Sequence, residues 1–327
     1  MKDRYFLAYR GSRSAASHSM DCIMRCLLVL TVLFIAFLPS RAAFSADEAP
    51  GKTQITVALI KNAFVESSKN DLAAAFKAFA KIISKQKGYD MEITVSIFKD
   101  ISELVNLPEN KRPQVVTLDS WSFLQMEKEG WLTPVTISSV GKEKVHTPYK
   151  ILVPSSSKTT TIEDLHGKTL NILFTSQTEI GVPWLCSLLR ERNLGKIESF
   201  FEDISFKEDP MEVLLPVFFE QRDAGLISEE EFGVMAKLNP QLREMRVIAV
   251  SRPLISAITA VSDTGWGSPG IKQDFIDVML KLHLSPEGQQ ILGLFKTDQI
   301  VAYQPEEMEP IRAIGKTLIT KHPHNSW

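Results

Sequence analysis

A run of polar residues that follows a predicted strand is the best candidate for ligand chemistry in this sequence. An apolar, strand-like segment covers residues 170–174, and a helix is predicted over about residues 179–193. Between them lie Thr175, Ser176, Gln177 and Thr178. Free backbone N–H groups and the positive end of the helix dipole attract an anion at such a turn, and hydroxyls add hydrogen-bond donors. Alternatively, Ser176 or Thr178 simply caps the helix.

Glu179 stands in the first turn of the same predicted helix. Its negative charge suits the positive end of the helix dipole. Towards a ligand it can act in two ways: it repels an anion, or it accepts a hydrogen bond from an amine or a protonated oxygen. Both interpretations of its effect on a ligand stay open. If the chain were an enzyme, Glu179 would be the only candidate for its catalytic acid.

Other candidates follow other predicted strands. In open α/β proteins, ligands bind beyond the carboxyl ends of the strands. Ser120 and Trp121 follow a strand at 114–118, and Asn62 and Phe64 follow a strand at 54–60. Ser120 could donate to a ligand and Trp121 could wall a pocket; the alternative makes Ser120 a helix N-cap and Trp121 a core aromatic.

Arg252 is the candidate cation, because a guanidinium binds an oxyanion or carboxylate with two parallel hydrogen bonds. Its alternative is a surface salt bridge. The chain has no G-x-S-x-G, P-loop or H-E-x-x-H motif. His146 and His166 have no second ligand at metal spacing, and Cys186 lies in an apolar helical stretch, as a small core residue does. We therefore expect no catalytic residue, no metal and no cofactor.

The elements that position these residues alternate between strand and helix. Period-two and β-branched segments predict strands at 54–60, 91–98, 114–118, 149–153, 170–174, 224–227 and 246–250. Helical spacing predicts helices at 72–88, 121–128, 179–193, 210–219 and 271–284, with another starting at 285. This alternation indicates an α/β fold with mixed, mostly parallel sheets.

The length of 327 residues favours two hydrophobic cores. The segments after residue 252 lack enough strands for a third domain, so we expect them to complete the first. The predicted first lobe is discontinuous, with residues 46–147 and 252–327. The second lobe is inserted at 148–251, and two hinge strands near 146–154 and 249–256 join the lobes.

Residues 1–45 have the features of a secretory signal. Arg25 precedes an apolar run at 27–38, and a segment rich in small residues follows at 40–46. The run is shorter than the roughly 20 residues of a membrane-spanning helix, so an uncleaved anchor is the alternative rather than the expectation. Met20 or Met24 could be the true start. We therefore expect an exported, periplasmic protein.

Charge restricts the partners. Residues 1–45 carry six basic and two acidic residues, so the rest has a formal charge of −6 against −2 for the whole chain. An acidic body argues against nucleic acid and anionic membranes as partners. An anionic ligand must then be held by local groups.

Three segments carry a family resemblance: residues 161–170 (TIEDLHGKTL), 221–225 (QRDAG) and 284–289 (LSPEGQ). In their order and spacing they resemble type II periplasmic binding proteins, in particular the phosphate/phosphite/phosphonate-binding proteins of ABC importers. The oxyanion loop of that family is Ser-Thr-Ser-Gly, and the matching positions here are Ser176, Gln177, Thr178 and Glu179. The chain departs from the family where Glu179 replaces the glycine.

The resemblance implies two α/β lobes that close around a small, oxyanionic solute. It also implies delivery to an ABC permease in the inner membrane, by a monomer without a cofactor. Two alternatives keep the same scaffold. In one, the domain presents its ligand to a membrane sensor kinase; in the other, it is an exported enzyme that uses Glu179.

Overall fold

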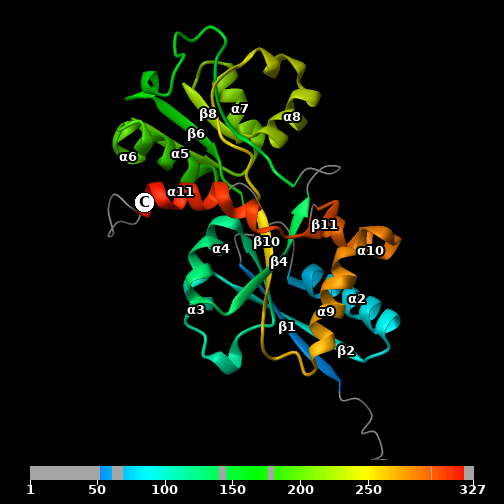
Figure 1. The fold of residues 1–327 in the computed structure, drawn as a ribbon. Helices are drawn as coiled ribbons and strands as arrows, with labels where there is room; N and C mark the ends of the chain where they lie inside the picture. Colours follow the sequence, from blue (N-terminus) through cyan, green and yellow to red (C-terminus); the bar gives the residue numbers. More distant parts are fainter. Residues whose placement is uncertain (1–51, 61–68, 140–144, 176–179, 296, 320–327) are drawn as a thin grey trace, which may run out of the picture. The chain divides into compact units, whose positions relative to one another are not determined.

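The computed structural model describes residues 52–60, 69–139, 145–175, 180–295 and 297–319, and these contain two β-sheets (Figure 1). The first sheet has the strand order β11-β4-β10-β3-β1-β2. Its strands are β1 (Thr53–Ile60), β2 (Met91–Phe98), β3 (Val115–Asp119), β4 (Leu132–Ser139), β10 (Ala257–Ser262) and β11 (Gln299–Ala302). This sheet therefore combines segments from both ends of the described chain.

Helices cover both faces of the first sheet. Successive side chains of a strand point to opposite faces, so each strand contributes to the apolar layer on both sides. Val57 and Leu59 of β1 belong to one apolar cluster, and Ala58 and Ile60 belong to another. The first cluster includes side chains of α2 (Lys69–Lys87), α9 (Pro269–Leu280) and α10 (Pro286–Leu294). The second includes side chains of α3 (Ile101–Val105), α4 (Ser120–Met126) and α11 (Glu309–Ile319).

The second sheet has the order β7-β6-β8-β5-β9. Its strands are β5 (Tyr149–Val153), β6 (Thr169–Leu173), β7 (Asp203–Lys207), β8 (Ala224–Ser228) and β9 (Arg246–Val250). Its helices are α5 (Gly181–Glu191), α6 (Ile197–Phe200), α7 (Pro210–Phe218) and α8 (Glu229–Leu238). Short 3-10 turns lie at Glu109–Lys111, Glu127–Glu129, Glu163–Leu165, Pro240–Glu244, Leu282–Leu284 and Pro305–Met308.

The α/β class and the mixed sheets are confirmed, but the expected excess of parallel pairing is wrong. Among the strands that the structure describes, four neighbouring pairs are parallel and five are antiparallel. The reason lies in the strands next to the chain crossings. β10 returns from the second sheet and inserts between β3 and β4 in the opposite direction, and β5 enters the second sheet antiparallel to both of its neighbours.

The chain passes between the sheets in two segments that are bonded to each other. Thr147 and Leu254 exchange backbone hydrogen bonds of 2.9 and 3.1 Å. The Ser251 amide donates to the Tyr149 carbonyl at 2.9 Å, and the Tyr149 amide donates to the Ser251 hydroxyl oxygen at 2.8 Å. Both side chains are buried. The two crossings therefore form a single paired element.

Two of the segments that carry the family resemblance have structural roles in the second sheet. The carboxylate of Asp223 accepts hydrogen bonds from the amide and hydroxyl of Thr169, at 2.9 and 2.8 Å, and lies 3.6 Å from the Lys168 ammonium. Burial works to raise the pKa of Asp223, but these bonds together hold it below its usual value. The motif at 161–170 is thus joined to the motif at 221–225, across the start of β6.

The third motif opens α10. The Ser285 hydroxyl accepts a hydrogen bond from the Gly288 amide at 3.1 Å and caps the helix. A side chain at Gly288 would place its Cβ 1.9 Å from the Leu282 carbonyl oxygen, so only glycine fits this close approach. None of the described helices has the length and apolar character required to cross a membrane.

Candidate ligand-binding site

In each sheet, the parallel strands have their carboxyl ends at the edge from which the crossings leave. In the first sheet β1, β3 and β4 run in one direction, and β10 begins at the edge where they end. In the second sheet β6 and β8 end at the edge where β5 begins and β9 ends. Residues that follow these strands are therefore placed near the crossings, which is where ligands bind in open α/β sheets.

Most of the predicted ligand residues lie outside the described part of the chain, and their roles stay predictions. These residues are Asn62, Phe64, Ser176, Gln177, Thr178 and Glu179. Thr175 is described: it is half-buried and follows the end of β6. Helix α5 begins at Gly181, and the residue in its N-cap position, Ile180, makes no side-chain capping hydrogen bond.

Ser120 connects the end of β3 to the second crossing. Its hydroxyl donates to the Ile255 carbonyl oxygen at 2.7 Å, its amide donates to the Ser256 carbonyl oxygen at 2.9 Å, and the side chain is fully buried. The N-cap of α4 is Asp119, whose carboxylate accepts from an amide in the first turn at 2.8 Å. The alternative that made Ser120 the N-cap is therefore wrong, because the preceding residue takes that position. Trp121 is half-buried and packs against the apolar cluster, so its two possible roles, as a pocket wall or as a core aromatic, stay predictions.

Arg252 is exposed at the second crossing. Its guanidinium pairs with no carboxylate among the described residues, so the surface salt bridge considered for it has no described partner. Its carbonyl oxygen accepts the Ser251 hydroxyl at 2.6 Å, which fixes the backbone at this position. Arg252 thus follows the end of β9 as an exposed residue, and its role in ligand binding stays a prediction.

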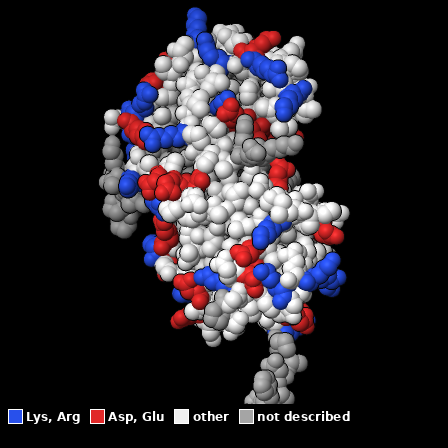
Figure 2. Space-filling model, turned by 45° about the vertical axis from the view of Figure 1, so that its right-hand side comes forward, with Lys and Arg blue, Asp and Glu red and all other residues white. Residues whose placement is uncertain are grey.

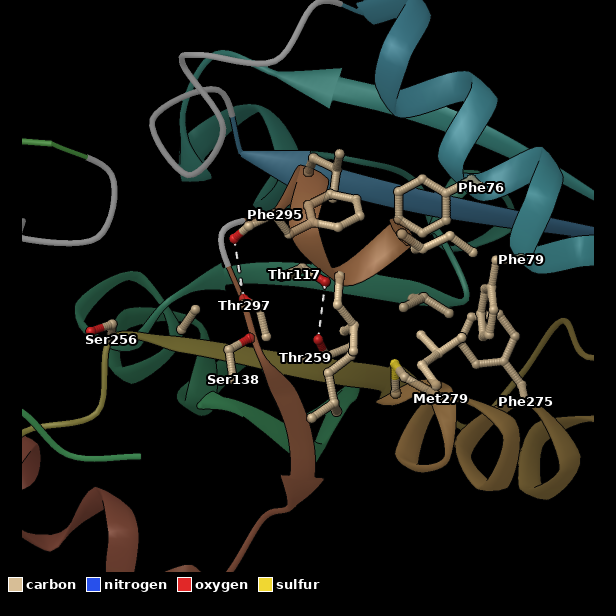
Figure 3. Close-up of a pocket in the computed structure, with 17 residues that line it drawn as sticks. Phe76, Phe79, Thr117, Ser138, Ser256, Thr259, Phe275, Met279, Phe295 and Thr297 are labelled. Atoms are coloured by element: carbon tan, nitrogen blue, oxygen red, sulfur yellow. Dashed lines mark hydrogen bonds between the residues drawn. The ribbon is translucent and has the colours of Figure 1, made fainter. Parts of the chain in front are cut away.

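Sequence reasoning missed a cavity of about 100 Å³ between the first sheet and helices α2, α9 and α10 (Figure 3). On the sheet side its walls are mostly small residues: Thr117 on β3, Ser138 on β4, Ser256 just before β10, and Ala257 and Thr259 on β10. On the helix side its walls include Phe76, Phe79, Phe275, Met279 and Phe295. Small side chains on neighbouring strands leave the space that the larger helix side chains do not fill.

Two observations on the described residues concern metal binding and nucleophilic chemistry. No cluster of three or more His, Cys, Asp or Glu side chains there could hold a metal ion. Burial raises the pKa of the Cys186 thiol to about 11, so this cysteine is protonated at neutral pH and a poor nucleophile. On the face drawn in Figure 2, basic and acidic side chains are interspersed, without one large basic patch of the kind that binds nucleic acid.

Comparison with known proteins gives a family match over most of the chain. A family model described as "ABC transporter, phosphonate, periplasmic substrate-binding protein" matches residues 64–308. No curated protein matches the sequence.

Solved structures share the fold at low sequence identity. A Xanthomonas citri protein bound to ATP is 16% identical, with a TM-score of 0.61 over 83% of this chain and 100% of that one. A binding protein component of an ABC phosphonate transporter from Pseudomonas aeruginosa is 14% identical, with a TM-score of 0.55 over 84% of this chain and 91% of that one. PhnD1 from Prochlorococcus marinus, in complex with methylphosphonate, is 16% identical, with a TM-score of 0.54 over 81% and 98%.

Proposed function

The chain belongs to the phosphonate-type periplasmic substrate-binding proteins of ABC transporters, and from this premise we propose that it closes around one small oxyanion at the chain crossings. The proposed lobes are residues 46–147 with 252–327, and residues 148–251. The single observation that carries the proposal is topological. Both crossings leave from the sheet edges where the parallel strands end, so loops from both lobes can reach the same solute.

Local groups must supply the attraction for an anion, because residues 46–327 have a formal charge of −6. On the first lobe and the crossing, we propose that Arg252 provides charge, with Trp121 and the residues after β1, Asn62 and Phe64, forming the wall. Ser120, which we expected to touch the ligand, contributes by holding the end of β3 against the crossing.

On the second lobe, the proposed anion site is the turn between β6 and α5. It contains Thr175, Ser176, Gln177, Thr178 and Glu179. Its chemistry is that of backbone N–H groups and hydroxyls at the start of a helix. Glu179 selects for a ligand that offers a proton, such as a monoprotonated phosphonate oxygen or an amine, because a carboxylate next to a fully ionised oxyanion is repelled.

A thermal-shift series tests this proposal. The ligands are methylphosphonate, aminoethylphosphonate, phosphite, phosphate and sulfate, added to residues 46–327. A ligand present at 100 times its Kd should stabilise the folded protein by about 2.7 kcal/mol. Stabilisation by at least one phosphorus oxyanion is expected, and the absence of any shift across the series would contradict the proposal.

Arg252 gives the matched variant test. Arg252→Lys keeps the charge but loses the planar donor pair, and Arg252→Ala loses both, so affinity should fall in that order. Arg243→Ala is the control, because Arg243 is an exposed arginine of the second lobe, away from the crossings. Equal ligand affinity of wild type and Arg252→Ala would remove Arg252 from the site.

We also propose binding without catalysis, in the periplasm, by a monomer that docks on an inner-membrane permease when closed. Substitution of Glu179 separates binding from turnover. In a binding protein, Glu179→Gln changes only ligand affinity or preference, whereas in an enzyme it abolishes product formation. Loss of a measurable turnover in Glu179→Gln would contradict the proposal and favour the enzyme alternative.

A further inference from the structure

Helix α11 contacts two helices that belong to different sheets (Figure 1). It follows β11 of the first sheet. One of its neighbours, α4, follows β3 of the first sheet, and the other, α5, follows β6 of the second sheet. Buried side chains of α4, α5 and α11 belong to one apolar cluster. Helix α11 is therefore a connection between the two sheets in addition to the two chain crossings.

On the side of the first sheet, α11 is held by an ion pair and by close packing. The Arg312 guanidinium donates to both carboxylate oxygens of Glu127, at 2.5 and 3.4 Å. Gly315 is buried, and a side chain there would place its Cβ 2.7 Å from a methyl carbon of Leu124 on α4. Together with the covalent connection to β11, these contacts fix α11 to the first sheet.

On the side of the second sheet, α11 is held at its last turn. The last four carbonyl groups of a helix have no partner within it, and they carry the negative end of the helix dipole. Arg190, near the end of α5, donates to the Leu318 carbonyl oxygen and to that of Thr317, the latter at 3.5 Å. The Thr317 hydroxyl lies 3.4 Å from a carboxylate oxygen of Glu191. Arg190 thus supplies both the hydrogen-bond donor and the positive charge that this helix end attracts.

The two attachments differ in how they respond to movement. A helix keeps its length, because its backbone hydrogen bonds fix the rise per residue. If the sheets move relative to each other, a helix that is attached to both must therefore detach from one of them. The contact with the first sheet includes a buried packing surface, whereas Arg190 and Thr317 are only half-buried and can exchange their hydrogen bonds with water. The contact at the last turn is therefore the one that yields.

We infer that α11 is a clasp that restrains the movement of the two proposed lobes, and that the contact between Arg190 and the last turn of α11 opens when the lobes move. The inference adds a restraint to the proposed hinge closure and rests on it only for the two-lobe arrangement. Its test uses no ligand, so its failure is distinguishable from a failure of ligand binding.

Distance measurements between two spin labels by pulsed electron paramagnetic resonance test the inference. The labels are attached to Lys81→Cys on α2 and Lys237→Cys on α8, which are exposed positions in the first and the second proposed lobe. The protein is residues 46–327, in which Cys186→Ala removes the remaining cysteine. With the clasp intact, the distribution of distances should be narrow.

Arg190→Ala removes the donor at the last turn. Because hydrogen bonds to a charged group are among the stronger ones, the ratio of released to clasped molecules should rise about tenfold, and the distance distribution should broaden. Arg192→Ala is the matched control. Arg192 lies two residues further along the chain, and its guanidinium pairs at 3.2 Å with Glu163, which belongs to the same proposed lobe. This control should keep the distribution of the parent protein.

Arg312→Ala tests the clasp from its other side. It loosens the attachment to the first sheet without changing α5, and it should broaden the distribution in the same way. It also decides the question if Arg190→Ala does not fold, which circular dichroism reports. Equal distributions in folded Arg190→Ala and Arg192→Ala would overturn the inference, and so would a parent protein whose distribution is already as broad as that of Arg190→Ala.

Discussion

Replacing Ser251 with alanine removes the acceptor of a buried backbone amide at the chain crossing. In the wild type, the Ser251 hydroxyl oxygen accepts from the Tyr149 amide at 2.8 Å and donates to the Arg252 carbonyl at 2.6 Å. Ser251 is 7% exposed and Tyr149 is 1% exposed, so water does not readily replace the lost hydroxyl. A buried donor left without an acceptor costs about 1–3 kcal/mol.

We therefore expect Ser251→Ala to lower the free energy of unfolding by about 2 kcal/mol, which corresponds to a fall in Tm of about 4–8 °C. Urea unfolding followed by circular dichroism measures the first quantity, and calorimetry measures the second. Ser268→Ala is the control, because Ser268 is exposed and makes no side-chain capping bond at the start of α9. A Ser251→Ala protein as stable as Ser268→Ala would show that the crossings are not held together as described.

Three further predictions concern stability and reactivity. Asp223→Asn weakens the bonds to Thr169, and urea unfolding at pH 7 should show a loss of about 1–2 kcal/mol. The folded state lowers the pKa of Asp223, so the carboxylate stabilises the fold above about pH 4, and this stabilisation is lost as the pH falls through the folded pKa. The unfolding free energies of wild type and Asp223→Asn should therefore converge in acid. A difference that stays constant with pH would contradict this. Gly288→Ala should cost about 1–3 kcal/mol from overpacking, whereas Gly293→Ala in the same helix has open space and should not destabilise; equal melting temperatures would refute the close approach. With residues 46–327 at pH 8, Cys186 should react slowly with iodoacetamide until urea unfolds the chain, and rapid labelling of the folded protein would contradict its burial and its pKa of about 11.

Local chemistry made many element boundaries predictable. The strand expected at 91–98 is β2, and the strand expected at 246–250 is β9, with the same bounds. Asp209 caps α7 with proline at the first helical position, as residue type and spacing indicate. In these segments one motif or one hydrophobic period determines the structure, so the sequence is sufficient to locate them.

Long-range pairing explains what could not be predicted. Strand β4 contains Pro134, and proline within a run argues against a central strand. In the structure, Pro134 pairs with Ala260 next to a shift in register, where proline is tolerated. Strand β7 (Asp203–Lys207) was also not predicted, although its apolar residues Ile204 and Phe206 alternate with polar ones. It is a short edge strand, and Phe206 is exposed.

The sequence predicted only part of the candidate site. The expectation that ligand residues follow strands placed Thr175, Ser120 and Arg252 near the crossings, but the hydrogen bond that buries Ser120 joins residues 135 positions apart. The cavity depends on small side chains from strands that are neighbours only in the folded sheet. No local sequence pattern predicts that small side chains on different strands meet in this way.

The central claim is that the chain binds one small phosphorus oxyanion, and titration calorimetry of residues 46–327 with methylphosphonate tests it most directly. The account predicts saturable binding of one ligand per chain, in competition with phosphite or phosphate. If the folded protein shows no saturable heat with any of the three ligands and no change in melting temperature, the account is contradicted.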